Sequence, residues 1–123
     1  MSTKVLIVDD SLYMQAIIKD ALETEGDRFE ILGTASDGES AIDMAFELQP
    51  ELVTLDNILP DMLGLDVIKT LKDQKPEIKI LMISAVGQQS VINTGISLGA
   101  DGYLVKPFTT EQLLEKISEI KSV

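Results

Sequence analysis

Short apolar runs rich in β-branched residues alternate along the chain with longer segments in which apolar residues recur at helical spacing. The runs cover residues 5–8, 29–35, 52–55, 78–83 and 103–105. The helical spacing is clearest at Met14, Ile17, Ile18, Ala21 and Leu22, at Ala41, Ile42, Ala45 and Leu48, and at Leu113, Leu114, Ile117 and Ile120. Continuous apolar strands are typical of a parallel sheet that is covered on both faces. We therefore predict an α/β fold in which five helices form the outer layers of a three-layer sandwich around a five-stranded parallel sheet.

Residues with known preferences for helix starts and stops stand between the apolar segments. They are Ser11, Asp37, Gly38, Pro50, Gly64, Pro76 and Gly87. The length of 123 residues is close to the commonest size of a single domain, and no linker or low-complexity tract interrupts it. We predict one domain over residues 1–123, with no separate effector domain.

The charge and composition exclude several classes of function. Asp and Glu total 21 against 10 Lys and Arg, a net charge of −11 that repels nucleic acids and anionic membranes. The chain has no Cys and no His, which excludes Ser-His-Asp and Cys-His nucleophiles and nearly all transition-metal sites. No signal peptide or membrane span is recognisable, so we expect a cytoplasmic protein that binds neither nucleic acid nor membrane.

The chemically informative residues follow the apolar runs directly. Asp9 and Asp10 follow the first run, Asp56 the third and Ser84 the fourth. Lys106, followed by Pro107, comes after the fifth run. Parallel strands bring their carboxyl ends to one edge of a sheet, where such folds bind ligands. We therefore expect three carboxylates, a hydroxyl and an ammonium group to converge there.

Taken singly, each of these residues has a plainer structural explanation, such as a helix cap for Asp10 or a solvated cation for Lys106. Together, three neighbouring carboxylates repel one another unless a cation is bound. Oxygen ligands without His favour Mg²⁺, with Mn²⁺ or Ca²⁺ as alternatives. An Asp carboxylate beside such a cation can act as a nucleophile and form an aspartyl phosphate. The cluster therefore indicates phosphoryl transfer.

Four segments carry a family resemblance that spans essentially the whole chain. VLIVDDS at 5–11, LVTLDNILPDMLG at 52–64, ILMISAVG at 80–87 and GYLVKPF at 102–108 resemble the receiver domain of two-component response regulators, and stand-alone CheY-type members most. The resemblance implies the flavodoxin-like strand order 2-1-3-4-5. It also implies that Asp56 is the phosphoacceptor and that Mg²⁺ is held by Asp9, Asp10, Asp56 and the backbone carbonyl of Ile58. Lys106 would contact the phosphoryl group, and its bond to Pro107 would be cis.

The resemblance further implies a conformational switch. Ser84 would move toward the phosphoryl group and Tyr103 would turn inward, which remodels the face made by the fourth helix, fifth strand and fifth helix. In relatives, the residues that tune hydrolysis occupy the positions of Ile58 and Val86 in this chain. Both are apolar here and cannot position a water, so we expect slow autodephosphorylation. We expect no enzymatic activity beyond promotion of the protein's own phosphorylation and this slow autodephosphorylation. Asn57 is unusual at a position where relatives often have an apolar residue.

The same resemblance implies a monomer with two kinds of partner. One is a histidine kinase, CheA-like or another. The other is an output protein, such as a flagellar motor switch component or a phosphatase, with a role in chemotaxis or motility. A phosphorelay intermediate and a single-domain regulator of another protein are alternatives. From the residues alone, a mononucleotide or flavin module and a Mg²⁺-dependent phosphatase also remain open. The acidic Asp9-Asp10-Ser11 turn disfavours the first, and the absence of a recognisable second acid or cap disfavours the second.

Overall fold

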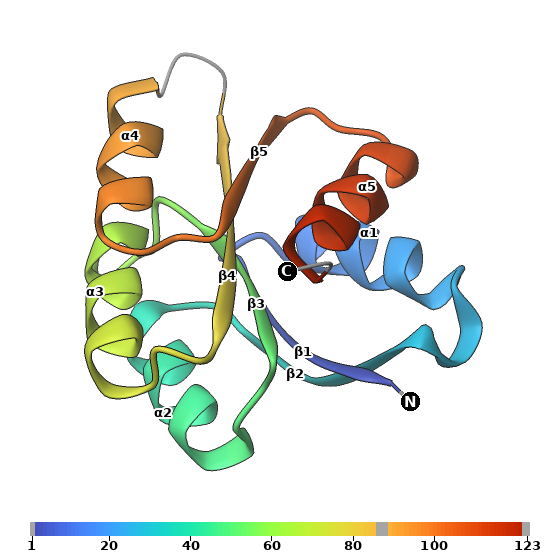
Figure 1. The fold of residues 1–123 in the computed structure, drawn as a ribbon, viewed down its shortest axis with the longest axis horizontal. Coiled ribbons are helices and arrows are strands. Elements are labelled where there is room, and N and C mark those ends of the chain that lie inside the picture. The colour runs from blue at the N-terminus through green and yellow to red at the C-terminus, as the bar shows by residue number, and fades with distance from the viewer. Residues whose placement is uncertain (1, 86–88, 122–123) are drawn as a thin grey trace.

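The computed structural model describes residues 2–85 and 89–121, in which strands and helices alternate (Figure 1). The strands are β1 (Thr3–Val8), β2 (Phe29–Ala35), β3 (Leu52–Asp56), β4 (Lys79–Ala85) and β5 (Gly102–Lys106). The helices are α1 (Leu12–Glu23), α2 (Gly38–Leu48), α3 (Gly64–Gln74), α4 (Gln89–Ser97) and α5 (Thr110–Lys121), and a short 3₁₀ turn covers Gly26–Arg28. No helix in these described ranges is long and apolar enough to cross a membrane.

The strands form one sheet in the order β2-β1-β3-β4-β5, and all neighbouring pairs are parallel. This confirms the predicted fold class and strand order. Some strands end later than the apolar runs predict, because the backbone pairing between strands continues past the last apolar residue of the run. β4 extends to Ala85, which pairs with Lys106 of β5. Ser84 therefore lies inside β4 and not after it, while Asp56 and Lys106 are the last residues of their strands.

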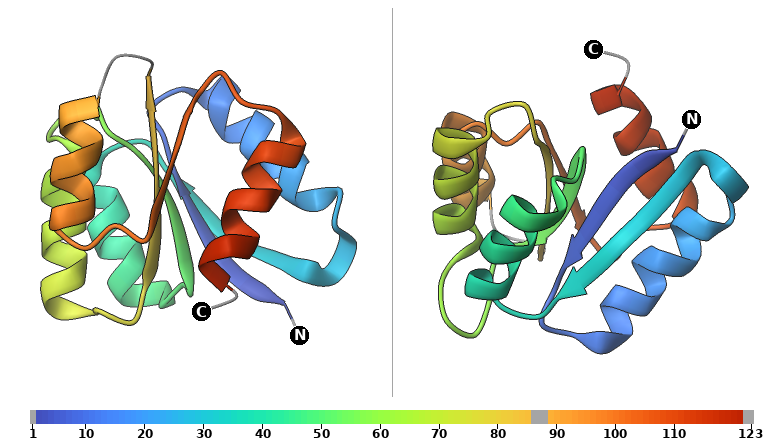
Figure 2. Two further views of the ribbon diagram at one scale, coloured as in Figure 1. Left: turned by 45° about the horizontal axis from the view of Figure 1, so that its top comes forward. Right: turned by 90° about the horizontal axis from the view of Figure 1, so that it is seen from below.

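Helices cover both faces of the sheet and enclose two separate hydrophobic cores (Figures 1 and 2). One face packs against α2, α3 and α4, and we call its apolar cluster the α2/α3/α4 core. The other packs against α1 and α5 around Ile18, Leu22, Leu113 and Ile117, which we call the α1/α5 core. The side chains of each central strand alternate between these cores, as the two-residue period of a strand requires. This alternation also determines on which face of the sheet the polar side chains at the strand ends lie.

Two of the predicted helix starts are built as expected. The Ser11 hydroxyl accepts a hydrogen bond from the backbone N–H of Met14 at 3.2 Å, and the Asp37 carboxylate accepts one from Ser40 at 2.7 Å. Both side chains satisfy backbone donors that a helix leaves unpaired at its first turn. Pro50 and Pro76 follow the ends of α2 and α3 as predicted, whereas Gly87 lies outside the described residues.

Gly64 opens α3 because the chain passes too closely over the end of β3 for any side chain. A Cβ atom at this position would lie 2.6 Å from the backbone oxygen of Asp56 and 2.9 Å from the Cα of Asn57. The Gly64 N–H donates to the Asn57 carbonyl across this approach. The loop between β3 and α3 is therefore pressed against the residue that ends β3.

Candidate functional site

Three carboxylates meet at the carboxyl edge of the sheet. Asp9 and Asp10 follow β1 directly, and Asp56 ends β3, the neighbouring strand. One carboxylate oxygen from each lies within 4.8 Å of the others. Asp9 is buried, with only 1% of its surface exposed, whereas Asp10 is exposed and Asp56 is partly buried. The structure thus brings together the acidic residues that the sequence analysis grouped.

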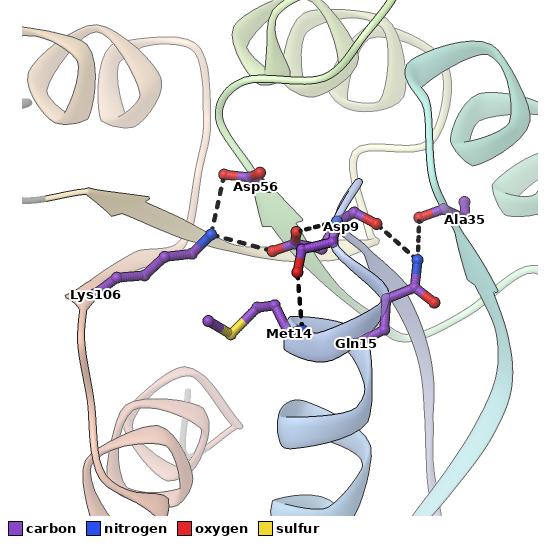
Figure 3. A network of polar contacts seen from close by, with 7 residues as sticks. Asp9, Met14, Gln15, Ala35, Asp56 and Lys106 are labelled. Atoms are coloured by element: carbon purple, nitrogen blue, oxygen red, sulfur yellow. Dashed lines mark hydrogen bonds and ion pairs between the residues drawn. The ribbon is translucent and has the colours of Figure 1, made fainter.

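Lys106, at the end of β5, reaches across the same edge toward this cluster (Figure 3). Its Nζ lies 3.2 Å from Oδ2 of Asp9 and 3.5 Å from Oδ1 of Asp56. Because side chains alternate along a strand, Asp9, Asp56 and Lys106 all lie on the face of the sheet that carries the α1/α5 core. Lys106 is the cation that the described residues bring within ion-pair distance of the carboxylates, so the cluster keeps a negative excess.

The electrostatic cost of this crowding falls on Asp56. Burial and the charge of Asp9 raise the pKa of the Asp56 carboxyl above its ordinary value, while the Lys106 ammonium group opposes that rise. A raised pKa means that the folded protein holds the ionised carboxylate less well than water does. The site therefore favours any additional positive charge that approaches these oxygens.

Gln15 of α1 fixes the backbone behind Asp9. Its amide Nε2 donates to the carbonyl of Asp9 at 2.7 Å and lies 3.4 Å from the carbonyl of Ala35 (Figure 3). It also lies 3.1 Å from the Ser36 hydroxyl. These bonds tie the loop after β1 to the loop after β2. The sequence analysis missed Gln15, although a polar residue in the buried α1 stripe with Ile18 and Leu22 is a readable signal.

Asp61 anchors the loop after β3 to the start of α2. Its carboxylate oxygens accept hydrogen bonds from the backbone N–H groups of Gly38 at 2.7 Å and Glu39 at 2.9 Å. These bonds lower the pKa of the Asp61 carboxyl, since they stabilise its ionised form. Asp61 was also missed, because its partners lie 22 and 23 residues earlier in the chain and no local pattern reveals them.

The remaining predicted site residues are distributed around the cluster. Ser84 is 1% exposed in β4, whereas Ile58 is 60% exposed in the loop that Asp61 anchors. Tyr103 is partly exposed on β5, and the Lys106–Pro107 peptide bond is cis. Val86 lies outside the described residues.

The donor set fits a hard divalent cation. All candidate ligand atoms are carboxylate oxygens, and two belong to residues that are partly or fully buried. Mg²⁺ binds through one or a few carboxylates and retains water ligands, which suits a cluster with one exposed, one partly buried and one buried acid. Asp9, Asp10 and Asp56 are therefore the residues that would hold such an ion.

The five-stranded parallel sheet and the acidic cluster at its carboxyl edge define a class of α/β domain with a candidate cation site at that edge. The chain matches the response regulator receiver domain over residues 5–118 and belongs to that family, which serves two-component signalling. Chemotaxis protein CheY of Thermotoga maritima is 37% identical, with 98% of each chain covered. CheY of Bacillus subtilis is 39% identical, with 97% of this chain and 98% of the relative covered. A chain in the CheX–CheY–BeF3–Mg²⁺ complex from Borrelia burgdorferi superposes with a TM-score of 0.91 at 29% identity, covering 97% of this chain and 89% of that one.

The raised pKa of Asp56 makes a stability prediction. The folded protein holds the Asp56 proton at a higher pH than the unfolded chain does. The free energy of unfolding therefore falls as the pH rises from the carboxyl pKa of the unfolded chain to the higher pKa of the folded protein. In Mg²⁺-free buffer at pH 7, Asp56→Asn should therefore raise the free energy of unfolding. The difference should shrink as pH falls toward the ordinary carboxyl pKa of about 4. Urea unfolding at a series of pH values measures both.

Asp61→Asn is the matched control, because the pKa of that carboxyl is shifted in the opposite direction. Its ionised form stabilises the fold, so this variant should be less stable than the wild type at pH 7 and approach it at low pH. Mg²⁺ at about a hundred times its dissociation constant should stabilise the wild type by about 2.7 kcal/mol. An Asp56→Asn protein that is less stable than the wild type without metal would contradict this account of the cluster.

Proposed function

We propose that the protein is a phosphoacceptor response regulator that receives a phosphoryl group on Asp56 with the help of Mg²⁺. The observation that carries this proposal is the convergence of Asp9, Asp10, Asp56 and Lys106 at one edge of the sheet. In the transfer, an Asp56 carboxylate oxygen forms the bond to phosphorus as the bond from phosphorus to the donor breaks. Because the chain contains no His, the phosphoryl group comes from a separate histidine kinase or a small phosphodonor.

Each residue of the site has a distinct role in this proposal. Asp9 and Asp10, with Asp56 and the Ile58 carbonyl, hold Mg²⁺, which offsets negative charge on the incoming phosphoryl oxygens when it is bound. Lys106 provides a fixed ammonium charge for another of those oxygens, and its contacts with both Asp9 and Asp56 support that position. The buried Ser84 hydroxyl donates a hydrogen bond to the phosphoryl group. The protein is a phosphoacceptor and not a turnover enzyme.

Phosphorylation changes the face formed by α4, β5 and α5, where the output partner binds. A pocket of about 450 Å³ on the β5 and α5 side of this face supports that location. It is lined by Tyr103, Lys106, Pro107, Gln112, Glu115 and Lys116, among others. The pocket connects Lys106 in the site with Tyr103, whose ring lies 5.4 Å from the Lys116 Nζ. A change at Lys106 therefore has a short route to a partly exposed aromatic side chain.

We further propose a role in chemotaxis. The CheY relatives, with 98% of the Thermotoga maritima protein covered, support this role. The partners would be a histidine kinase and an output protein such as a flagellar motor switch component or a phosphatase. The Borrelia burgdorferi complex, which pairs CheY with CheX, supports the binding of a second protein to a domain of this shape.

Incubation with acetyl phosphate and Mg²⁺ tests the core of the proposal. The intact mass should increase by one phosphoryl group in the wild type, because of the two carboxylates beside Lys106 only Asp56 is partly exposed, whereas Asp9 is buried. Asp56→Asn should show no increase, and chelation of Mg²⁺ should prevent it in the wild type. Equal labelling of the variant would place the acceptor elsewhere and contradict the proposal.

The lifetime of the phosphoryl group should be long, because the exposed Ile58 side chain offers no hydrogen bond to an attacking water. Ile58→Asn should accelerate loss of the label by up to about a hundredfold, because a positioned polar group can contribute a rate effect of that size. Leu63→Asn is the control, since Leu63 is an exposed apolar residue bridged to Ile58 on the same loop. The decay of ³²P-labelled protein in Mg²⁺ measures both, and equal decay in the wild type and Ile58→Asn would reject the role of Ile58.

The chemotaxis role is tested by binding to a peptide from a flagellar motor switch component. Beryllofluoride-treated protein with Mg²⁺ should bind this peptide more tightly than untreated protein, because the mimic stabilises the partner-binding state. Tyr103→Ala should reduce the difference. Transfer of phosphate to a histidine phosphotransfer protein, without binding of the switch peptide, would instead support the relay alternative.

A further inference from the structure

The loop after β3 folds back on itself as a tight turn. Ile58 and Leu63 form an isolated antiparallel bridge, and the Leu59 N–H donates a hydrogen bond to the Met62 carbonyl at 3.2 Å. Within residues 58–63, all of which the structure describes, only Leu59 is buried, with 6% of its surface exposed. The turn therefore has little apolar packing of its own to fix its position.

The tip of this turn lies against the first residues of α2. The Asp61 carboxylate accepts hydrogen bonds from the N–H groups of Gly38 at 2.7 Å and Glu39 at 2.9 Å. The Met62 side chain fills the space beside Gly38, where a Cβ atom would lie only 2.5 Å from the Sδ atom of Met62. Two adjacent residues of the turn thus contact the same point of the helix, one through charge-assisted hydrogen bonds and one through packing.

Asp61 adds to a cap that α2 already has. The N-cap residue Asp37 accepts a hydrogen bond from the Ser40 N–H at 2.7 Å, as residues at this position commonly do. Asp61 pairs the N–H groups of Gly38 and Glu39, which Asp37 leaves free, and it comes from a different loop. The positive end of the helix dipole also favours a carboxylate there. The start of α2 therefore provides an attachment point for the turn after β3.

The attached turn carries a group that the proposed function requires. Ile58, at the start of the turn, has the backbone carbonyl that we assign to Mg²⁺, and its side chain is 60% exposed, so packing of this side chain does not fix the backbone. We propose that Asp61 is a positioning residue for the metal site: its bonds to α2 hold the turn, and with it the Ile58 carbonyl, in one position before the ion binds. This inference rests on the proposed function, in which that carbonyl is a metal ligand.

The connection between the turn and α2 works in both directions. If Asp61 couples them, an ion that fixes the turn also stabilises the hydrogen bonds from Gly38 and Glu39, because coupling between two sites is reciprocal. Mg²⁺ should therefore slow hydrogen exchange at these two amides, although neither residue belongs to the metal site. A role of Asp61 as a helix cap alone predicts no such response.

Titration of the protein with Mg²⁺ by calorimetry tests the positioning role. Asp61→Ala removes both hydrogen bonds and should weaken Mg²⁺ binding by about tenfold, the lower end of the effect of groups that orient metal ligands. Asp61→Asn keeps one acceptor oxygen, so its affinity should lie between those of Asp61→Ala and the wild type. It also keeps the test available if Asp61→Ala does not fold. In 1 M KCl the Debye length is about 3 Å, which screens the long-range effect of the lost charge.

Asp37→Ala is the matched control. It also removes a carboxylate and a capping hydrogen bond from the start of α2, but it leaves the bonds between the turn and the helix in place. It should lower the free energy of unfolding and leave Mg²⁺ affinity unchanged.

Hydrogen exchange adds a measurement that does not involve phosphorylation. In metal-free protein, the Leu59 amide should exchange faster in Asp61→Ala than in Asp37→Ala, because only the first substitution releases the turn. The slowing of exchange by Mg²⁺ at Gly38 and Glu39 should occur in the wild type and be lost in Asp61→Ala.

Three results would overturn the role of Asp61. They are wild-type Mg²⁺ affinity in both Asp61 variants, equal weakening in Asp61→Ala and Asp37→Ala, and slowing of exchange at Gly38 and Glu39 that survives in Asp61→Ala. A wild-type protein that neither binds Mg²⁺ nor is labelled at Asp56 would instead reject the proposed function itself. The two failures are therefore distinguishable.

Discussion

The crowding of three carboxylates at one edge of a parallel sheet is the constraint on which the rest of the site depends. Asp9 is buried, and the single ammonium group of Lys106 lies near both Asp9 and Asp56. The negative charge of the cluster therefore exceeds the positive charge beside it. Such an arrangement persists only where the surrounding backbone holds it. Gln15 fixes the chain behind Asp9, Asp61 anchors the loop after Asp56, and the absence of a side chain at Gly64 lets that loop approach. Three separate packing features thus support one electrostatically costly arrangement.

This cost is also what makes the site responsive. A phosphoryl group adds about −1.5 to −2 charges in ordinary phosphoproteins. At Asp56 that charge would be placed where burial and the charge of Asp9 already raise the pKa of the carboxyl, so the folded state depends strongly on which cations and donors face it. Lys106 contacts Asp9 and Asp56 and also lines the pocket on the β5 and α5 surface. A local change of charge therefore has a physical route to that surface.

The layers and the acidic cluster could be predicted from local patterns and from parallel topology, whereas the strand order was implied by the family resemblance. Apolar runs define buried strands, and parallel strands bring Asp9, Asp10, Asp56 and Lys106 to one edge. The supporting contacts could not be predicted in the same way. Asp61 accepts hydrogen bonds from the first residues of a helix, 22 and 23 positions earlier in the chain, and Gln15 bonds to two loops, so both depend on tertiary placement.

The central claim is that this cluster directs a phosphoryl group to one carboxylate. The most direct measurement is borohydride reduction of protein treated with acetyl phosphate and Mg²⁺, followed by peptide mapping. Reduction converts a phosphorylated aspartate into homoserine and so marks the acceptor by its position. The account predicts homoserine at position 56 and at none of the other acidic residues. Homoserine at position 9 or 10, or spread over surface carboxylates, would contradict it.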